Sequence, residues 1–515
     1  MASHVIGIGL KGLEGYRVSV EVEAVNGINS MVIVGLPDAS VRESKERISA
    51  AFHALGYFHN HQKLIINLSP AEQRKNSPMF DLPIAIAILL ELGEINPTIP
   101  ESTGFIGALS LDGSIHVVES MLPAVMAAKK VGLKKLYLPY DDSFPLLVIE
   151  GLELVFVRTL QDVIQLLYGH KVPQPLLNKP YQEYSTIPQC NFEKIIGHSY
   201  AKYALEIAAA GEHHVLMSGP PGCGKSMLAE SFPSILPFLS KESQLEMLSI
   251  YQLSGVPVKP TLSPPFRSPH HSSSAVSIIG GGKNPKPGEI SLAHHGVLFL
   301  DEIAEFPKKT LEMLRQPLEA GKVTISRVHS SVTYPSSFIL LGAMNLCPCG
   351  YHGSKSHYCT CTKKQIFSYQ NRLSGPMKDR FDIFLELDSE NLKDQSKIPQ
   401  ESSETIRERV TSARKRQYHR YGKEITNSRI SYDMLLKKCP PSKQQLILMQ
   451  QLSQKQGLSN RAQIKIFWLA RTIADLQQND NITDQNLWEA MKLHSLHLIK
   501  NERPFLIEGG AYLKS

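Results

Sequence analysis

Residues 219–226 read Gly219-Pro220-Pro221-Gly222-Cys223-Gly224-Lys225-Ser226, which fits the phosphate-binding pattern G-x-x-x-x-G-K-[ST]. In such a loop the glycines let backbone N–H groups curl around a phosphate, the lysine offsets its charge, and the serine hydroxyl ligates Mg²⁺. The flanks agree, because residues 214–218 read as a short buried strand and residues 226–230 open a helix. The stretch therefore predicts a loop that binds ATP.

A second pattern lies downstream, where the apolar run 297–300 ends in Asp301 and Glu302. The run is typical of a buried strand, and α/β sheets bind ligands at the carboxyl ends of their strands. We expect Asp301 to hold the water shell of the Mg²⁺ ion that Ser226 ligates. Glu302 is the candidate base that aligns water against the γ-phosphate, because phosphoryl transfer depends mostly on positioning and charge stabilisation.

Length and composition limit the number of domains, the location and the partners that we expect for this protein. The chain has 515 residues, enough for about three or four domains with their own cores. Its longest apolar run, residues 82–92, is too short to cross a bilayer, and residues 1–4 lack the basic start of a secretory signal, so we expect a cytoplasmic protein without a membrane partner. The net charge of +7 permits a nucleic-acid partner without proving one.

The patterns divide this α/β multidomain chain into four parts. Residues 1–168 mix alternating strands with helical patterns and predict an α+β domain, and residues 169–189 are proline-rich and predict a linker. Residues 190–400 contain the phosphate-binding loop and predict a core with a buried parallel sheet, and residues 401–515 predict a helical lid. Basic residues crowd between positions 407 and 420, where a solvated surface and a nucleic-acid contact are both open explanations.

With these parts assembled, the chain resembles the magnesium-chelatase-like group of AAA+ ATPases over nearly its whole length. Besides the two patterns above, the resemblance is carried by residues 196–198 (IGH), 266–271 (FRSPHH), 288–296 (GEISLAHHG), 344–350 (MNLCPCG), 374–376 (SGP), 379–382 (DRFD) and 459–462 (SNRA). The resemblance implies a parallel sheet with a helical lid, a homohexameric ring and ATP bound between subunits. It also places Ile196 among the nucleotide-binding residues.

The resemblance assigns catalytic work to three further polar residues, each with an alternative explanation. Asn345 follows an apolar strand and matches the sensor-one residue, which holds the attacking water; otherwise it is a turn former. Arg461 lies in the first turn of a helix, where the helix dipole disfavours a cation, and matches the sensor-two arginine that faces the γ-phosphate; otherwise it pairs with a carboxylate. Arg380 matches the arginine finger that reaches a neighbouring subunit's nucleotide; otherwise it pairs with Asp379 or Asp382.

Two stretches exceed what a minimal ATPase core needs. Residues 280–288 form a basic, glycine-rich tip, and residues 322–334 alternate like a β-hairpin. In the family both correspond to insertions that face the central pore of the ring. Lys283, Lys286 and Arg327 are therefore candidates for DNA phosphate contacts that read no sequence, with plain exposed loops as the alternative.

Cysteines crowd into residues 347–361, which we treat as a candidate insertion in the core. Two C-x-C pairs are separated there by nine residues: Cys347, Cys349, Cys359 and Cys361. Four soft ligands suit Zn²⁺. Because C-x-C is tighter than the common C-x₂-C spacing, reduced thiols and a mixed set with nearby histidines stay open as alternatives. We expect this cluster to stiffen the loop behind the strand that leads to Asn345.

Residues 104–139 resemble part of the catalytic domain of Lon proteases, which use a Ser–Lys dyad. An approximate alignment places residues 78–80 at the nucleophile and Leu122 at the lysine. Ser77 is nearby, but no lysine stands at the matching position. We therefore expect a Lon-like domain without peptidase activity, used for assembly or partner binding.

For the whole chain, the resemblance implies an ATP-driven hexameric DNA motor, a helicase or translocase that promotes branch migration in homologous recombination. It further implies integration of DNA during natural transformation, with single-stranded or branched DNA and recombination proteins as partners. The alternative is a chelatase-type motor that remodels a protein or inserts a metal. A scaffold that binds ATP without hydrolysis is a third possibility, against which the candidate base Glu302 argues.

Overall fold

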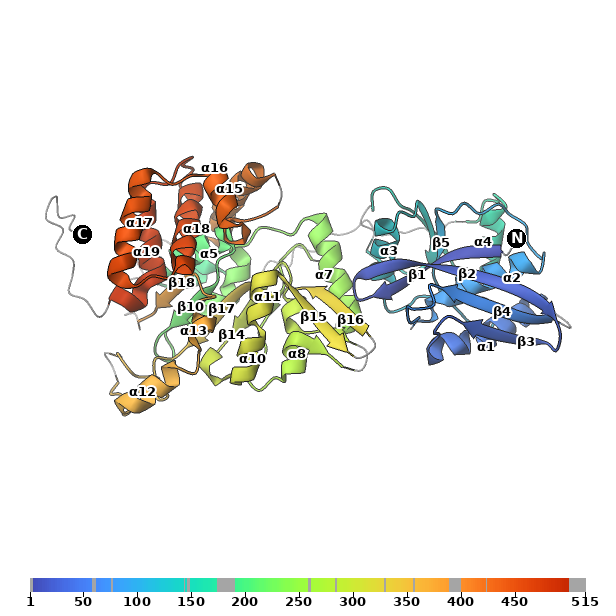
Figure 1. The fold of residues 1–515 in the computed structure, drawn as a ribbon, viewed down its shortest axis with the longest axis horizontal. Helices are drawn as coiled ribbons and strands as arrows, with labels where there is room; N and C mark the ends of the chain where they lie inside the picture. The colour runs from blue at the N-terminus through green and yellow to red at the C-terminus, as the bar shows by residue number, and fades with distance from the viewer. Residues whose placement is uncertain are drawn as a thin grey trace.

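The structure is a computed structural model of the 515-residue chain. It describes residues 3–57, 62–75, 77–142, 144–145, 149–173, 190–257, 261–282, 285–327, 330–354, 357–388, 400–422 and 424–499. An amino-terminal domain, a central α/β core and a carboxyl-terminal helical lid follow one another along the molecule (Figure 1).

The amino-terminal domain is built on a seven-stranded mixed sheet in the order β3-β4-β2-β1-β5-β8-β9. Antiparallel ladders join β1 to β2 and β2 to β4, whereas the other neighbours run parallel. The strands are β1 Ser3–Lys11, β2 Glu14–Asn26, β3 Ser30–Val34, β4 Gln62–Ser69, β5 Thr103–Phe105, β8 Lys135–Pro139 and β9 Glu153–Val157, with β6 Ala108–Leu109 and β7 Ile115–His116 as a small hairpin. The helices are α1 Ala39–Leu55, α2 Asp81–Glu91, α3 Met121–Lys130 and α4 Leu160–Leu167.

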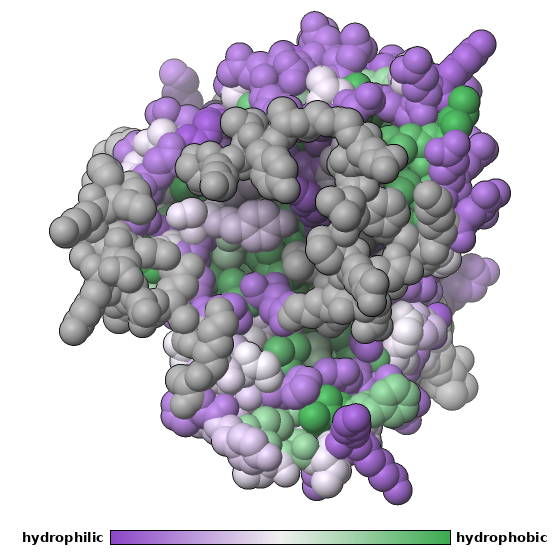
Figure 2. Space-filling model, turned by 90° about the vertical axis from the view of Figure 1, so that its left-hand side faces the viewer, coloured by the Kyte–Doolittle hydropathy of each residue, from purple (hydrophilic) through white to green (hydrophobic). Residues whose placement is uncertain are grey.

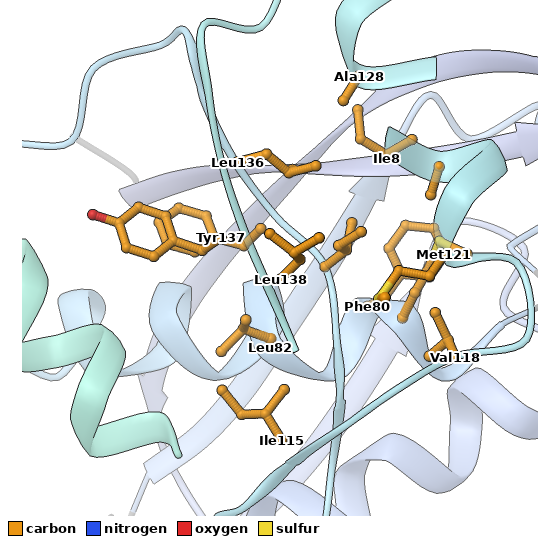
Figure 3. Close-up of a cluster of buried hydrophobic side chains, with 14 of the residues drawn as sticks. Ile8, Phe80, Leu82, Ile115, Val118, Met121, Ala128, Leu136, Tyr137 and Leu138 are labelled. Atoms are coloured by element: carbon orange, nitrogen blue, oxygen red, sulfur yellow. The ribbon is translucent and has the colours of Figure 1, made fainter. Parts of the chain in front are cut away.

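The core of this domain forms where the sheet meets α2 and α3. β2 turns Val18 and Val20 inward on alternate positions, as expected of a strand with one covered face. α2 is apolar all round and therefore runs through the interior. Figure 3 shows Phe80, at the start of α2, converging with Met121 of α3 and Leu138 of β8.

The central core carries a five-stranded sheet in the order β11-β14-β17-β10-β18, in which every neighbouring pair is parallel. Its strands are β10 Val215–Ser218, β11 Phe266–Arg267, β14 Val297–Leu300, β17 Ile339–Met344 and β18 Ile383–Glu386. β10, β14 and β17 are buried along their whole length, which explains their nearly continuous apolar sequences. The predicted parallel sheet is confirmed.

Helices and two hairpins surround this sheet. The helices are α5 Ser199–Gly211, α6 Lys225–Ser231, α7 Lys241–Ser254, α8 Ala275–Ile279, α9 Glu289–Leu292, α10 Lys308–Met313, α11 Arg315–Ala320, α12 Lys363–Gln370 and α13 Gly375–Lys378. The hairpins pair β12 Gly280–Gly281 with β13 Lys286–Pro287, and β15 Lys322–Arg327 with β16 Ser330–Pro335. The second hairpin agrees with the alternation seen in the sequence.

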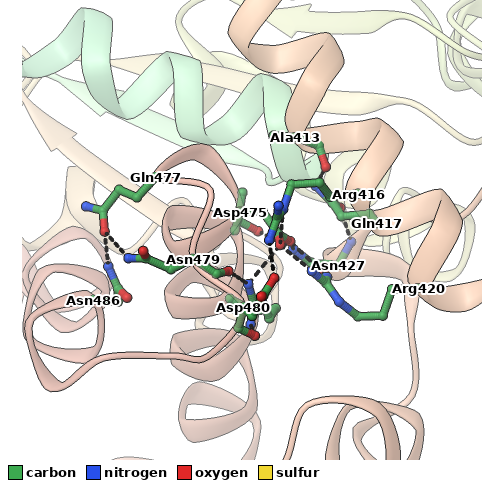
Figure 4. Close-up of polar contacts among 12 residues, drawn as sticks. Ala413, Arg416, Gln417, Arg420, Asn427, Asp475, Gln477, Asn479, Asp480 and Asn486 are labelled. Carbon is green, nitrogen blue, oxygen red and sulfur yellow. Dashed lines mark hydrogen bonds and ion pairs between the residues drawn. The ribbon is translucent and has the colours of Figure 1, made fainter.

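The lid contains α15 Ser403–Tyr421, α16 Tyr432–Lys438, α17 Lys443–Gln456, α18 Asn460–Leu476 and α19 Asp484–Ile499. The basic stretch on α15 makes cross-links inside the protein. Arg409 binds Glu206 of α5 at 2.7 Å, and Arg416 and Arg420 converge on Asp475 of α18 (Figure 4). These contacts favour a structural explanation of the stretch over a nucleic-acid one.

The predicted domain limits can be placed against these elements. α4 ends at Leu167, residues 174–189 of the predicted linker lie outside the described residues, and α15 begins at Ser403. The amino-terminal domain meets the core where α3 lies against α7, and the backbone N–H of Leu122 donates to Gln252 at 3.0 Å. In the described ranges no helix is long and apolar enough to cross a membrane.

Seen from the lid end, hydrophilic residues crowd the upper rim and hydrophobic ones gather in patches between them (Figure 2).

Candidate nucleotide-binding site

The predicted phosphate-binding loop leaves β10 at Gly219 and ends where α6 begins at Lys225, which is the expected strand–loop–helix arrangement. Gly222 and Gly224 have φ angles of 75° and 86°, in the left-handed region that favours glycine. A Cβ at Gly219 would lie 2.4 Å from the carbonyl oxygen of Leu387. The loop therefore has the glycine geometry that lets backbone N–H groups approach a phosphate.

Lys225 connects this loop to the end of the neighbouring strand. Its ammonium donates to the carbonyl oxygens of Gly219 at 2.8 Å and Pro220 at 2.9 Å, and to the amide oxygen of Asn345 at 3.3 Å. Asn345 directly follows β17, so the predicted sensor residue lies beside the predicted phosphate lysine. A phosphate in the loop would accept hydrogen bonds from the same ammonium group.

Ser226 and Asp301 come together as the sequence predicted. The Ser226 hydroxyl donates to Oδ2 of Asp301 at 3.0 Å, from the start of α6 to the carboxyl end of β14. Hydroxyl, carboxylate and water oxygens are the ligands that Mg²⁺ prefers in nucleotide sites. The residues present therefore fit a magnesium site at this edge of the sheet.

Glu302 stands in a strained turn immediately after Asp301. Its φ of 48° lies in the left-handed region, which costs a residue with a Cβ on the order of 1–3 kcal/mol. Its carboxylate is about half exposed and lies 3.7 Å from Nδ1 of His271. Strain of this kind persists where surrounding structure holds a side chain in place, which suits a residue that must aim at a water molecule.

Arg380 and Arg461 lie together, away from these groups. Arg380 contacts Oε1 of Glu319 at 2.7 Å, and Arg461 contacts the same oxygen. Arg380 therefore pairs with a carboxylate of its own chain, as its alternative explanation required, but that carboxylate is Glu319 rather than Asp379 or Asp382. The alternative explanation for Arg461 was an ion pair with a carboxylate, and Glu319 is such a partner.

The two groups occupy opposite edges of the sheet. β10 and β18 are parallel, with Val215 opposite Ile383 and Ser218 opposite Glu386. The phosphate-binding loop follows Ser218, whereas Arg380 precedes Ile383 by three residues. A strand of four residues spans roughly 13 Å, so the backbone of Arg380 is separated from the start of the loop by about the length of β10.

Arg380 has unused hydrogen-bonding capacity. It is 8% exposed, and among the described residues its Nε and Nη1 atoms are buried without a hydrogen-bond partner. Burial, and then the neighbouring Arg461 charge, lower the pKa of this guanidinium. A second anion beside Arg380 would satisfy both the donors and the charge.

A buried network anchors the lid at the same edge. Asp382 accepts from Lys465 of α18 at 2.8 Å and from the backbone N–H of His214 at 3.0 Å. Burial alone would raise the pKa of Asp382, but the Lys465 charge holds it well below its ordinary value. Burial lowers the pKa of His214 to about 3, and its Nδ1 accepts from the backbone N–H of Leu340 at 3.0 Å.

The candidate DNA residues lie on two adjacent hairpins. Lys286 is exposed on β13, and the Tyr334 hydroxyl of β16 donates to the carbonyl oxygen of Pro285 at 2.7 Å, which ties the hairpins together. Arg327 ends β15, although its side chain lies outside the described residues, as does Lys283. The structure therefore places the two predicted insertions side by side.

The four clustered cysteines converge. Their sulfur atoms all lie within 4.8 Å of one another, with Cys347 Sγ 3.3 Å from Cys349 Sγ and 3.7 Å from Cys359 Sγ. All cysteines of the described residues are free rather than disulfide-bonded. This grouping favours the four-cysteine set, with Cys361 as its fourth member, over the mixed set with histidines.

Sequence reasoning missed three residues of the site. The ring of His198 lies 3.5 Å from where a Gly224 side chain would begin, and His271 lies beside Glu302. Both stand in stretches that carry the family resemblance, so a signal was available. Glu319 carried no such signal in the sequence, because its partners Arg380 and Arg461 are distant along the chain.

Three family models match the chain. Residues 191–395 match "Magnesium chelatase, subunit ChlI", residues 20–142 match "Subunit ChlI of Mg-chelatase", and residues 400–494 match "Magnesium chelatase, subunit ChlI C-terminal". The matches therefore extend over the amino-terminal domain, the core and the lid.

Individual relatives are similar over almost the whole chain. YifB of Escherichia coli (strain K12) is 37% identical over 490 residues, which cover 94% of this chain and 95% of YifB. Competence protein ComM of Haemophilus influenzae is 36% identical, covering 93% of this chain and 95% of ComM. The magnesium-chelatase 67 kDa subunit of Chlorobaculum parvum is 28% identical over 29% of this chain and 22% of the subunit. The chain therefore belongs to the magnesium-chelatase-like AAA+ family, in the group that contains YifB and ComM.

Proposed function

We propose that this chain is an ATP-hydrolysing motor that works as a homohexameric ring on DNA. In this role it promotes branch migration in homologous recombination and the integration of DNA taken up in natural transformation. The observation that carries the proposal is the division of the predicted catalytic groups between two edges of one sheet. Asp301 and Asn345 lie with the phosphate-binding loop at one edge, and Arg380 lies with Arg461 at the other.

At the loop edge, each side chain has a defined task. Lys225 offsets phosphate charge, and the backbone of the loop positions the phosphates. Mg²⁺ held through Ser226 and Asp301 would neutralise charge that develops during phosphoryl transfer. Glu302 orients the attacking water, and the amide of Asn345 holds it in line.

The arginine edge lies at the opposite ends of the strands from the phosphate-binding loop of its own chain. A neighbouring subunit whose loop edge faced this surface would bring a γ-phosphate to Arg380 and Arg461, in competition with Glu319. The unpartnered donors of Arg380 supply the capacity for that contact. Such a contact joins two different surfaces, and heterologous contacts of this kind close into rings when the rotation allows it.

The DNA part of the proposal is supported by the joined hairpins and by the relative named for competence. Exposed Lys286 lies on β13, and Lys283 and Arg327 belong to the same two segments of sequence. In a ring these hairpins would line the pore and contact phosphates through charge alone. The amino-terminal domain, as a Lon-like platform without peptidase activity, would support assembly or bind recombination proteins.

A chelatase-type motor that acts on a protein or a metal complex is the second candidate. Its support is the match to the magnesium-chelatase 67 kDa subunit, which extends over 29% of this chain. ComM matches over 93%, including the amino-terminal domain. The longer match favours the DNA motor.

The proposal is tested by ATPase rates without DNA and with single-stranded, duplex and branched DNA at two salt concentrations. We expect salt-sensitive stimulation that is greatest with single-stranded or branched DNA, because phosphate contacts release counterions. Glu302→Gln serves as the hydrolysis-deficient control. An ATPase that Glu302→Gln abolishes but that no DNA stimulates would contradict the DNA part and favour a protein substrate.

A further inference from the structure

We propose that the four cysteines after β17 bind one zinc ion, and that this metal site holds the phosphate-binding loop and Asn345 in their relative positions. The four ligands are Cys347, Cys349, Cys359 and Cys361. The second half of the inference rests on the proposed ATPase function. The first half, metal binding, is independent of it.

The spacing of the sulfur atoms is that of a metal site. Zinc–sulfur bonds of about 2.3 Å in a tetrahedron place neighbouring sulfurs about 3.8 Å apart. The three separations among Cys347, Cys349 and Cys359 are 3.3, 3.7 and 3.6 Å. A disulfide would require about 2.05 Å. The sulfurs therefore surround a common centre at approximately the distance that a zinc ion needs.

A backbone donor points at one of the sulfur atoms. The N–H of His352 donates to Cys347 Sγ at 3.3 Å. Hydrogen bonds of this kind stabilise thiolates, which are the form that ligates metal, and they orient the ligands. On binding, the four thiols would release their protons to solvent.

The same loop packs directly on the nucleotide site. Gly350 has a φ of 86°, and a Cβ placed on it would lie 2.6 Å from Cγ of Pro221 in the phosphate-binding loop and 3.9 Å from Cγ of Asn345. Gly350 is adjacent to ligand Cys349, and its N–H donates to the carbonyl oxygen of Cys347 at 3.0 Å. Fixing these cysteines on a metal therefore fixes the surface against which Pro221 rests.

Metal binding is tested on the full chain by elemental analysis, and by the visible spectrum after replacement with Co²⁺, which reports tetrahedral thiolate ligation. We expect about one zinc per chain in the unmodified protein. Cys359→Ser should lose it, and Cys439→Ser, at a free cysteine in the lid, should keep it. Absence of stoichiometric zinc in the unmodified protein, or equal zinc in Cys359→Ser, would overturn the site.

The coupling is tested by comparing Gly350→Ala with Gly353→Ala. Both glycines lie in the same loop with positive φ, at 86° and 78°, so both substitutions introduce backbone strain. The nearest atom to a Cβ at Gly353 is 3.9 Å away, on Leu346, so this variant leaves Pro221 undisturbed. Both variants should keep zinc, and Gly350→Ala should weaken binding of a fluorescent ATP analogue at least about fivefold more than Gly353→Ala.

Equal affinities in the two glycine variants would overturn the coupling and leave the zinc site standing. Because the analogue reports binding rather than turnover, this result is separable from failure of the proposed motor. A chain that binds zinc and the analogue but hydrolyses no ATP would contradict the proposed function alone.

Discussion

The two edges of the five-stranded sheet both carry charged side chains, but they use them differently. At the carboxyl edge, Ser226 donates to Asp301 and Lys225 donates to Asn345, and Ser226, Asp301 and Asn345 are only partly buried. At the amino edge, Asp382 and Lys465 are almost completely buried and connect the sheet to the lid. The difference teaches that one edge leaves its polar groups open to a ligand, whereas the other uses them to join the sheet to the lid.

The largest expected effect comes from dividing the catalytic groups between two subunits. Arg380→Ala should lower the ATPase rate about 10³-fold, because arginine fingers contribute on this scale to phosphoryl transfer. Lys225→Ala should abolish activity by removing the phosphate lysine. Mixing the two inactive variants should restore part of the activity, because some neighbouring pairs then combine an intact loop edge with an intact arginine edge.

Steady-state ATPase rates over a series of mixing ratios measure this restoration. A mixture of Lys225→Ala with Glu302→Gln is the matched control, because both substitutions damage the same edge and no pair can compensate. If Arg380 acted on its own subunit's nucleotide, both mixtures would stay inactive. That result would contradict the proposal that the two edges act together from neighbouring subunits.

The second effect tests whether the amino edge is a rigid support. Lys465→Met removes the ammonium partner of Asp382 and leaves a carboxylate that is 3% exposed beside the His214 N–H and the His213 ring, which should cost about 3–5 kcal/mol of stability. Adding Asp382→Asn should recover part of the loss, because the uncompensated charge disappears. Denaturation followed by tryptophan fluorescence measures both, since Trp468 and Trp488 lie in α18 and α19 of the lid. An unchanged transition in Lys465→Met would show that the network does not hold the lid.

A smaller effect should appear in the pH dependence of stability. Buried His214 has a pKa of about 3, against an ordinary value of 6.5, so the unfolded chain binds more protons between these values. Stability is therefore fully present above pH 6.5 and falls as the pH is lowered toward 3, by about 2 kcal/mol between pH 7 and 5. His214→Asn keeps an acceptor for Leu340 without titrating, so the difference between the two proteins should shrink as the pH falls.

How well the sequence predicts the site differs between these two edges of the sheet. The carboxyl edge could be predicted because Asp301 and Asn345 each directly follow an apolar strand and the loop that leads to Ser226 begins where β10 ends. Parallel topology brings such residues together. The amino edge could not, because Glu319 reaches Arg380 and Arg461 from a distant helix and no local pattern marks it. The arginines of α15 show the same limit, since their charge was visible in the sequence but their carboxylate partners were not.

The smallest effect concerns the hairpins that precede β14 and β17. Lys286 is exposed on β13, so Lys286→Ala should weaken DNA binding equally for all sequences and reduce the slope of log affinity against log salt by about 1. Lys443, exposed at the start of α17 in the lid, carries the same charge, and Lys443→Ala should leave the slope unchanged. Fluorescence anisotropy with labelled single-stranded DNA at several salt concentrations measures both slopes. Equal slopes would mean that DNA senses only the overall charge of the chain, whereas a difference would place the DNA on the hairpins, apart from the predicted phosphate-binding loop.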